Sequence, residues 1–169
     1  MANRAGLRLV GDGLVLREWE RGDLAAMVKL FDDPEVAHWT PLVTPFDLEA
    51  AQAYLDKAHA DNGRFQLAIT VDGGEPMGEV LLMTDKATLG YSVGPAFRGQ
   101  RLAVRALKLL TTYAHEEGGL PRVILEIEPD NAASSGVARS SGYQLTDLPP
   151  TIVTDKGREV SLLTWEHLG

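Results

Sequence analysis

The segment from residue 89 to residue 119 constrains the fold most, because a strand pattern passes into a helix pattern within a few residues. Every second residue from 89 to 93 is apolar or aromatic, as in a half-buried strand. Pro95 then ends strand pairing, because proline has no N–H group to donate. Apolar residues afterwards recur with helical spacing, at Leu102, Ala106, Leu109, Leu110 and Tyr113. Two glycines at 118 and 119 end the helix.

The start of this helix, residues 98–103 (Arg-Gly-Gln-Arg-Leu-Ala), has the features of an anion site. Several backbone N–H groups in a first helical turn have no partner within the helix, and the helix dipole adds partial positive charge. Gly99 lets the backbone approach a ligand closely, while Arg98 and Arg101 add full charges. The pattern predicts a site of the size of a pyrophosphate. A basic helix start on the protein surface has the same pattern.

Composition limits the classes of protein to which the chain can belong. With 169 residues we expect one domain, spanning 1–169. The chain has no cysteine, which excludes disulfides, zinc–thiolate sites and cysteine nucleophiles. No apolar run is long enough to span a bilayer, and the first six residues lack the apolar core of a signal peptide, so we expect a cytoplasmic protein with no membrane partner. A net charge of −8 argues against nucleic acid as a partner and weakly favours amines.

The remaining periodic segments predict a mixed α/β fold. Strands are expected at 14–19, 65–71, 78–84, 88–93 and 123–127, and the last hairpin has arms at 143–154 and 159–165. Helices are expected after an Asp23 cap, after a Thr44 cap with Pro45 at the first helical position, and after an Asn131 cap. The order β-α-α-β-β-β-α-β-α-β-β predicts a mixed sheet with helices on both sides. The pair Pro149-Pro150 is expected to break or bulge the first arm of the hairpin.

Three stretches resemble the GNAT N-acetyltransferase superfamily. Residues 98–103 resemble its signature Arg/Gln-x-x-Gly-x-Gly/Ala, which holds the pyrophosphate of acetyl-CoA, although Arg101 stands in the place of the central glycine. The stretches Asn131-Ala-Ala-Ser134 and Gly142-Tyr143 resemble two further elements of the family. Together with residues 14–24, they resemble the branch of ribosomal-protein N-terminal alanine and serine acetyltransferases.

The resemblance implies a GNAT-like fold and acetyl-CoA as co-substrate, with no metal. In this family the strands before and after the central helix splay apart, and the pantetheine arm lies between them. The cofactor-binding residues implied are Tyr91, Ser92, Val93, Arg98, Gly99, Gln100, Arg101, Leu102, Ala103, Asn131, Ser134 and Arg139. Relatives that pair through their C-terminal strands make a homodimer a further expectation.

Acyl transfer to an amine needs a neutral amine, a stabilised oxyanion and a thiolate that can leave. By resemblance, the N–H of Val93 is the candidate for the oxyanion. Ser134 is the candidate donor to the leaving sulfur, although it can equally complete a helical turn. Glu128, at a strand end, is the first candidate base, although most such glutamates are simply solvated. Glu79 is a further candidate base.

Acceptor recognition is the least determined part of the sequence. His38 and Trp39 lie where the family forms one wall of the acceptor site, and with Glu79 they are the expected substrate-binding residues, although such a His–Trp pair more often serves packing. The resulting hypothesis is acetyl transfer from acetyl-CoA to a protein N-terminus or a small-molecule amine by direct attack in a ternary complex. The alternative is a non-catalytic CoA-binding domain, which Arg101 in the glycine position motivates.

Overall fold

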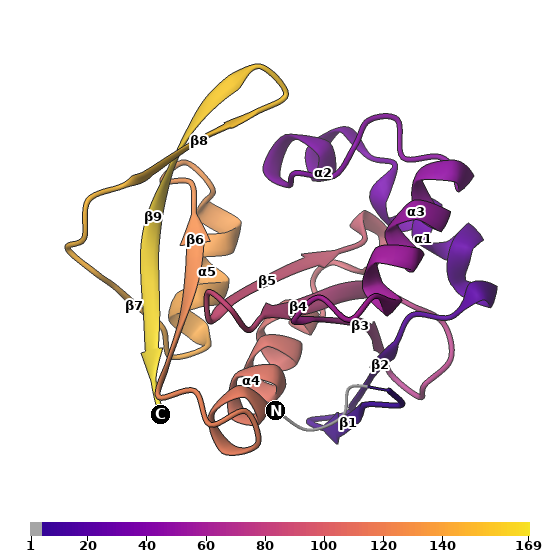
Figure 1. The fold of residues 1–169 in the computed structure, drawn as a ribbon, viewed down its shortest axis with the longest axis horizontal. Helices are drawn as coiled ribbons and strands as arrows, with labels where there is room; N and C mark the ends of the chain where they lie inside the picture. Colours follow the sequence, from indigo (N-terminus) through magenta and orange to yellow (C-terminus); the bar gives the residue numbers. More distant parts are fainter. Residues whose placement is uncertain (1–4) are drawn as a thin grey trace.

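A mixed sheet of nine strands forms the centre of the computed structural model, which describes residues 5–169 (Figure 1). Eight of these strands follow one another in the order β1-β2-β3-β4-β5-β6-β9-β7, and β8 pairs with β9. The strands are β1 (Arg8–Gly11), β2 (Leu14–Glu18), β3 (Arg64–Thr70), β4 (Gly78–Met83), β5 (Thr88–Val93), β6 (Arg122–Ile127), β7 (Gln144–Leu145), β8 (Thr151–Asp155) and β9 (Arg158–Leu168). The mixed α/β class is therefore confirmed, and the expected element order holds apart from three additions. These are a strand at the start, the helix α2 (Pro34–Trp39), and the division of the first hairpin arm into β7 and β8. Residues 1–4, which belong to the N-terminal stretch used above to argue against a signal peptide, lie outside the described part.

The helices cover both faces of the sheet. In the described chain they are η1 (Arg21–Asp23), α1 (Leu24–Phe31), α2 (Pro34–Trp39), α3 (Leu48–His59), η2 (Pro95–Phe97), α4 (Leu102–Glu116) and α5 (Ala132–Ser140). Helices α1 and α3 pack together on one face, and α4 packs with α5 on the other (Figure 1). Helix α2 lies between that first pair and the β8–β9 hairpin (Figure 1).

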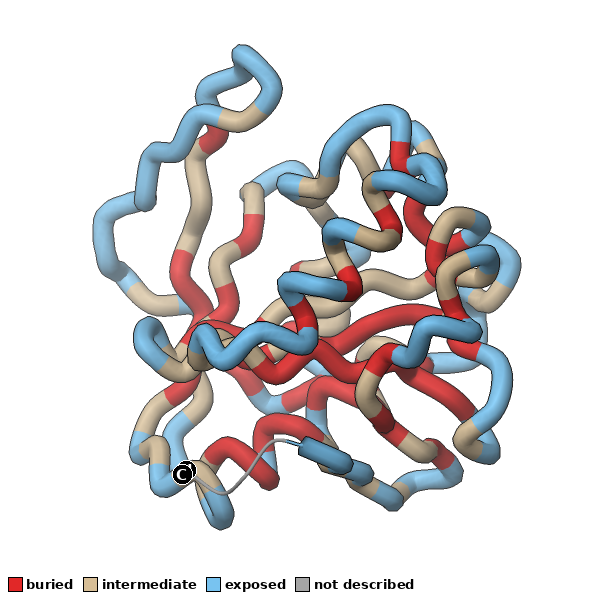
Figure 2. The backbone as a smooth tube through the Cα atoms, turned by 45° about the vertical axis from the view of Figure 1, so that its right-hand side comes forward, coloured by how far each residue is buried: buried red, intermediate tan, exposed pale blue. Residues whose placement is uncertain are grey.

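Each face of the sheet buries its own apolar cluster. The larger cluster joins α4 to the strands through residues such as Leu67, Leu82 and Leu107. The smaller one packs Trp19 and Phe46 against α1 and α3. Buried residues follow the central strands and the inner sides of the helices, whereas the tip of the β8–β9 hairpin is exposed (Figure 2). The tip is therefore held by polar contacts of Lys156 and Arg158, whereas the rest of β9 is anchored by pairing with β6 and by buried residues such as Trp165.

The sheet opens between β5 and β6. These parallel strands pair only at Thr88 and Ile124, whereas the neighbouring β4 and β5 pair over six residues. Ile124 donates its N–H to the carbonyl of Ala87 at 2.9 Å, and beyond this point the two strands diverge (Figure 1). The expected splay is confirmed, and it leaves one edge of β5 open for a ligand.

One expected helix start was wrong. Asp47 rather than Thr44 caps α3, because its carboxylate accepts the N–H of Ala50 at 2.9 Å. Asp23 is the N-cap of α1 as expected, although its carboxylate bonds none of the N–H groups of α1. That carboxylate accepts the N–H of Glu20 at 2.8 Å and forms a buried ion pair with Arg17, which ties the start of α1 to β2.

The segment between α1 and α3 contains a helix that the sequence did not predict. Asp33 accepts the N–H groups of Glu35 and Val36, and Pro34 takes the first helical position, so α2 begins with both signals of a helix start. A helix of six residues is too short for an apolar periodicity to show. The break at Pro149-Pro150 is confirmed, because β7 ends before it and β8 begins after it.

Candidate active site

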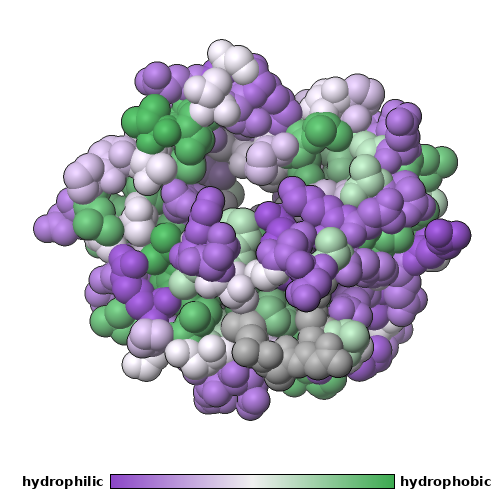
Figure 3. Space-filling model, viewed as in Figure 1, coloured by the Kyte–Doolittle hydropathy of each residue, from purple (hydrophilic) through white to green (hydrophobic). Residues whose placement is uncertain are grey.

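Two adjoining cavities open where β5 and β6 diverge. The first has a volume of about 370 Å³ and lies against the start of α4; the second has a volume of about 570 Å³ and lies under α2 and α3. In the space-filling view, the surface is hollowed between the β8–β9 hairpin and the side that carries α2 (Figure 3). The two cavities share six of their lining residues, which are Trp39, Thr40, Tyr91, Ser92, Asn131 and Ser134.

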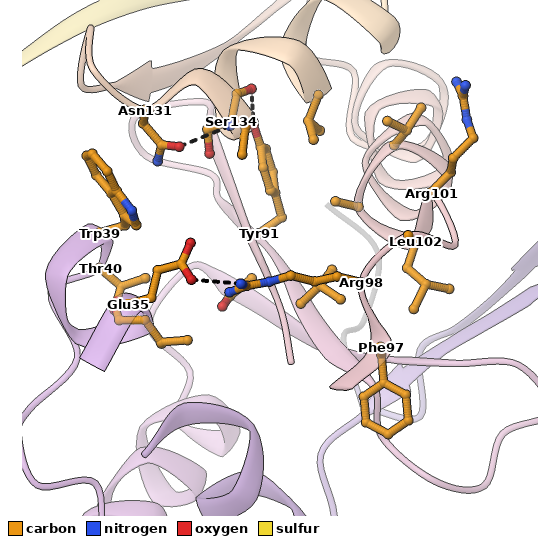
Figure 4. A pocket seen from close by; sticks show the side chains of 18 residues that line it. Glu35, Trp39, Thr40, Tyr91, Phe97, Arg98, Arg101, Leu102, Asn131 and Ser134 are labelled. Carbon is orange, nitrogen blue, oxygen red and sulfur yellow. Dashed lines mark hydrogen bonds and ion pairs between the residues drawn. The ribbon is translucent and has the colours of Figure 1, made fainter. Parts of the chain in front are cut away.

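The first cavity is built from the turn that leads into α4. Gly99 has a φ of +85° and Arg101 has a φ of +57°. Arg101 thus has the left-handed backbone that favours glycine, and its side chain points away from the Arg98–Glu35 pair (Figure 4). The residue in the glycine position therefore keeps the backbone course that a glycine would take. The turn that contains Arg101 still lines the first cavity.

Arg98 crosses this cavity to reach α2. Its guanidinium makes an ion pair of 2.7 Å with the carboxylate of Glu35, and both side chains are about half exposed (Figure 4). A phosphate is a stronger partner for a guanidinium than an exposed carboxylate, because it offers more charge and a bidentate geometry. The pair is therefore one that an incoming pyrophosphate can replace.

The wall between the two cavities is held by hydrogen bonds from β5 and α5. The hydroxyl of Tyr91 donates to the carbonyl of Ser134 at 2.9 Å, and the side chain of Asn131 accepts the N–H of Ser134 at 3.1 Å. Burial raises the pKa of Tyr91 to about 12, so the phenol stays protonated and remains a donor. Asn131 is thus the cap of α5, as expected, and it also lines both cavities.

The second cavity contains a buried carboxyl group, Glu79 on β4. Its side chain is 3% exposed and accepts hydrogen bonds from Trp19 Nε1 at 2.7 Å and from the hydroxyl of Tyr54 at 2.6 Å. Burial raises the pKa of Glu79 to about 7, although both hydrogen bonds act in the opposite direction. Glu79 lies opposite Ser92 in the β4–β5 register, next to the opening between the strands. It is therefore a carboxyl group able to exchange a proton near neutral pH.

Glu128 lies in a different electrostatic setting. Both of its carboxylate oxygens accept hydrogen bonds from the guanidinium of Arg158, at 2.9 and 3.3 Å. Arg158 also donates to the carbonyl of His38, and Lys156 donates to the carbonyls of Ala37 and Thr40. The β8–β9 hairpin thus binds the carboxyl end of α2 and engages Glu128 at the same time. Both candidate bases therefore have their carboxylate oxygens engaged, Glu128 by a guanidinium and Glu79 by two neutral donors.

The structure brings most of the expected site residues together. Tyr91, Ser92, Val93, Arg98, Gly99, Arg101, Leu102, Ala103, Asn131 and Ser134 line the first cavity; Trp39, Glu79 and Glu128 line the second. Gln100, Arg139 and His38 line neither of these two cavities. The guanidinium of Arg139 lies 5.2 Å from the ring centre of Trp165, and the ring of His38 packs edge-on against Trp39.

Several residues that shape the site were not predicted from the sequence. Glu35 was not named, and neither were Trp19 and Tyr54, which bind Glu79, or Arg158, which binds Glu128. The partners of Glu79 lie 60 and 25 residues away along the chain, so no local pattern relates them to it. For Glu35 the one available signal was the Asp33-Pro34 helix start.

Metal-binding clusters and membrane-spanning helices are both absent from the residues that the structure describes. In the part of the chain that the structure describes, no group of three or more His, Cys, Asp or Glu residues is arranged to hold a metal ion. Among the same residues, no helix has the length and apolar character that crossing a membrane requires.

The site is thus an opening between parallel strands, with a basic helix start on one side and a buried carboxyl group on the other. The family model for the acetyltransferase (GNAT) domain matches residues 13–144. The chain belongs to this family and is an acetyl-CoA-dependent acetyltransferase that acts on amines.

Individual relatives agree with this assignment. The chain is 25% identical over 135 residues to the uncharacterized N-acetyltransferase YnaD of Bacillus subtilis, covering 78% of this chain and 79% of the relative. The structure of RimL, a ribosomal L7/L12 α-N-protein acetyltransferase, is similar with a TM-score of 0.80 at 17% identity, covering 97% of this chain and 95% of RimL. That of spermidine N-acetyltransferase from Vibrio cholerae, solved with CoA and spermine, has a TM-score of 0.76 at 16% identity, covering 94% of this chain and 96% of the other.

Proposed function

We propose that this acetyltransferase moves the acetyl group of acetyl-CoA directly to a primary amine, with both substrates bound at once and without a covalent enzyme intermediate. One observation carries the proposal: two separate cavities meet at Ser92 and Ser134. Each substrate can therefore enter from its own side and reach the other at the splay. The absence of cysteine is consistent with direct attack.

The first cavity fits the CoA moiety. The turn 98–103 and the first N–H groups of α4 are placed for the pyrophosphate, with Arg98 supplying a full charge. The open edge of β5 offers backbone groups to the pantetheine arm, which would extend toward Val93. The left-handed backbone of Arg101 argues against the alternative of a closed, non-catalytic site.

The reaction needs three groups from this chain. The amine nitrogen attacks the thioester carbonyl carbon, and the N–H of Val93 stabilises the oxygen as it gains negative charge. Glu79 accepts the proton that the attacking nitrogen loses. The C–S bond then breaks, and the hydroxyl of Ser134 donates a hydrogen bond to the leaving thiolate.

The acceptor is a primary amine on a protein N-terminus or on a small molecule. RimL and spermidine N-acetyltransferase represent one class each and have the same fold. Their likeness to this chain therefore supports acetyl transfer without choosing between the two classes. The choice depends on the side chains of the second cavity, because substrate specificity resides in the site rather than in the fold.

Calorimetric titration with acetyl-CoA and with desulfo-CoA, followed by turnover with a set of amines, tests the proposal. We expect both cofactor forms to bind at micromolar concentration. Ser134→Ala should lower kcat about tenfold and leave the Kd of acetyl-CoA unchanged, since one hydrogen bond to the thiolate contributes on the order of 1–2 kcal/mol.

Ser140→Ala is the matched control, because Ser140 is exposed on the same helix and lines neither cavity. Tight binding of both cofactor forms without turnover of any amine would overturn the transferase proposal. A change in Kd alone for Ser134→Ala would make Ser134 a binding residue only.

A further inference from the structure

The second cavity is lined by five strands of the sheet, β3 to β6 and β9. Its floor contains Arg64 from β3, Glu79 from β4, Ser92 from β5 and Glu126 from β6. Paired strands lie about 4.8 Å apart, so the floor spans roughly 10 Å from β3 to β5. The divergence of β5 and β6 widens it further toward Glu126. The proposed reaction occurs near the β5–β6 end, and the rest of the cavity extends toward β3 and α3. An acceptor bound here is therefore an elongated molecule with its amine at one end.

The charges in this cavity are separated along its length. Glu126 lies on the β6 side beside Glu128, whose carboxylate is paired with Arg158, and Glu79 lies between the two ends. At the opposite end, Lys57 on α3 and Arg64 on β3 are the cationic side chains that line the cavity. The β6 end therefore suits an ammonium group, and the β3 end suits an anion.

The two cations are positioned by different means. Lys57 is exposed, follows Tyr54 by one helical turn, and has no hydrogen-bond or ion-pair partner for its ammonium group among residues 5–169. The guanidinium of Arg64 is partly buried, and its Nε donates to Gln66 Oε1 at 3.1 Å. One charge is thus fixed at the floor and the other is free to follow a ligand.

The wall between the two charged ends is apolar. Leu42 and Phe46 from the α2–α3 connection face Leu81 and Met83 on β4 across the cavity. Such a wall excludes water and thereby strengthens the interaction of a ligand's charges with the groups at each end.

Building on the proposed function, we propose that the acceptor is a primary amine joined by an extended, partly apolar chain to a carboxylate. Ser92 pairs with Glu79, and Glu79 pairs with Ala68, so Arg64 lies two strands across the sheet and four residues along β3 from Ser92. This places the two backbones about 16 Å apart, and the long side chain of Arg64 can cover part of that distance. A peptide N-terminus with an acidic third residue has this chemistry, and so does a long ω-amino carboxylic acid. A polyamine does not, because its second ammonium group would face Lys57 and Arg64.

Three amidated tripeptides that differ in one side chain test this assignment: Ser-Ala-Glu-NH2, Ser-Ala-Gln-NH2 and Ser-Ala-Lys-NH2. Calorimetry on the protein saturated with desulfo-CoA gives their Kd values without any need for turnover. The Glu peptide should bind about tenfold more tightly than the Gln peptide, and the Lys peptide should bind most weakly. The preference should weaken at high salt, because both cations are partly solvated.

Charge reversal at one position assigns the preference to this cavity. Lys57→Glu should make the Lys peptide bind more tightly than the Glu peptide. Lys108→Glu is the control with the same change in net charge, since Lys108 is exposed on α4, which covers the other face of the sheet. It should leave the order of the three peptides unchanged.

The outcomes separate this inference from the proposed function. Equal Kd values for the three peptides, absence of binding, or an order that Lys57→Glu does not change would overturn the inference. Acetylation of all three peptides without preference would do so while the proposed function stands. Binding with the expected preference but without acetyl transfer would overturn the proposed function and leave the charge assignment standing.

Titration with 8-aminooctanoic acid and with spermidine distinguishes a small acceptor from a peptide. Tighter binding of spermidine than of the Glu peptide would contradict the inference.

Discussion

The two cavities of the active site are built in different ways. The first is formed mostly by short, contiguous stretches, namely the end of β5, the turn before α4 and the start of α5, and α2 closes one side of it. The second is assembled from the side chains of α2, α3 and five strands, which come from distant parts of the chain. A site made of backbone depends on local conformation, whereas a site made of side chains depends on the whole fold. A site of the first kind can therefore be predicted from local sequence patterns, whereas a site of the second kind cannot.

Helix α2 belongs to both cavities. Glu35 at its start lines the first cavity, and Trp39 and Thr40 at its end line both. Its start is bound to Arg98, and its end is bound to Lys156 and Arg158 of the β8–β9 hairpin. Substitutions that alter one cavity and not the other therefore measure whether the two cavities bind their substrates independently.

The largest expected effect belongs to the second cavity alone. Glu79→Gln should lower kcat by about 10²- to 10³-fold, because an amide of the same shape cannot accept the proton of the amine. The wild-type rate should rise with pH through about 7, following ionisation of Glu79, and this rise should be absent in the variant. Steady-state kinetics from pH 5.5 to 9 and calorimetry with acetyl-CoA measure both. An unchanged kcat, or an equally large loss of acetyl-CoA affinity, would contradict the assignment of the base.

The same group should make stability depend on pH. The folded state holds a proton on Glu79 up to pH about 7, whereas the unfolded chain releases it near 4.5, so the folded state binds more protons between these values. The free energy of unfolding should therefore fall as pH rises through this window, by on the order of 3 kcal/mol in total. Glu79→Gln should remove that part of the fall.

Urea denaturation of both proteins at pH 5 and pH 8 measures this difference. The variant should lose less stability than the wild type between the two pH values, while the m-value stays the same. If both proteins lose equal stability, Glu79 is ionised in the folded state throughout this range. Glu79 would then act as a base with an ordinary carboxyl pKa.

In the first cavity the largest expected effect follows loss of Arg98. Arg98→Ala should weaken acetyl-CoA binding by about 1–3 kcal/mol, the contribution of a charge-assisted hydrogen bond to a phosphate. Binding of an amine in the second cavity should change little. Calorimetry measures the affinity, and Arg21→Ala provides the control, because Arg21 is exposed and lines neither cavity. Unchanged affinity in Arg98→Ala would place the phosphates elsewhere.

The difference between the cavities also explains what the sequence could predict. The order of strands and helices and the cap at Asn131 were predicted, because each has a local signal in alternation, helical spacing or capping. The splay between β5 and β6 has no such signal and was expected only from the resemblance to the family. The turn 98–103 also has a local signal, and its role in binding an anion stays a prediction. Even its departure from the family pattern is local, since Arg101 takes the backbone conformation of the glycine it replaces.

The second cavity was predicted only in part. Glu79 was named as a candidate, but its burial between Trp19 and Tyr54 follows from tertiary packing. Glu128 had the same local signals as a base, and its bond to Arg158 depends on how a distant hairpin folds back. A carboxylate's neighbours decide its chemistry, and these neighbours are not encoded near it in the sequence.

The smallest expected effect concerns the contact that joins α2 to the first cavity. Glu35→Gln removes the carboxylate that occupies Arg98 and that would repel an incoming phosphate. An exposed ion pair contributes little, so acetyl-CoA should bind only about two- to fivefold more tightly, and the gain should shrink at high salt. Glu49→Gln, which removes an exposed charge on α3 outside both cavities, is the control.

Because Glu35 and Trp39 share one short helix, the affinity of Glu35→Gln for an amine in the second cavity should be measured as well. If Glu35→Gln changes the affinity for acetyl-CoA alone, the two cavities bind their substrates independently. If it changes both, α2 couples them.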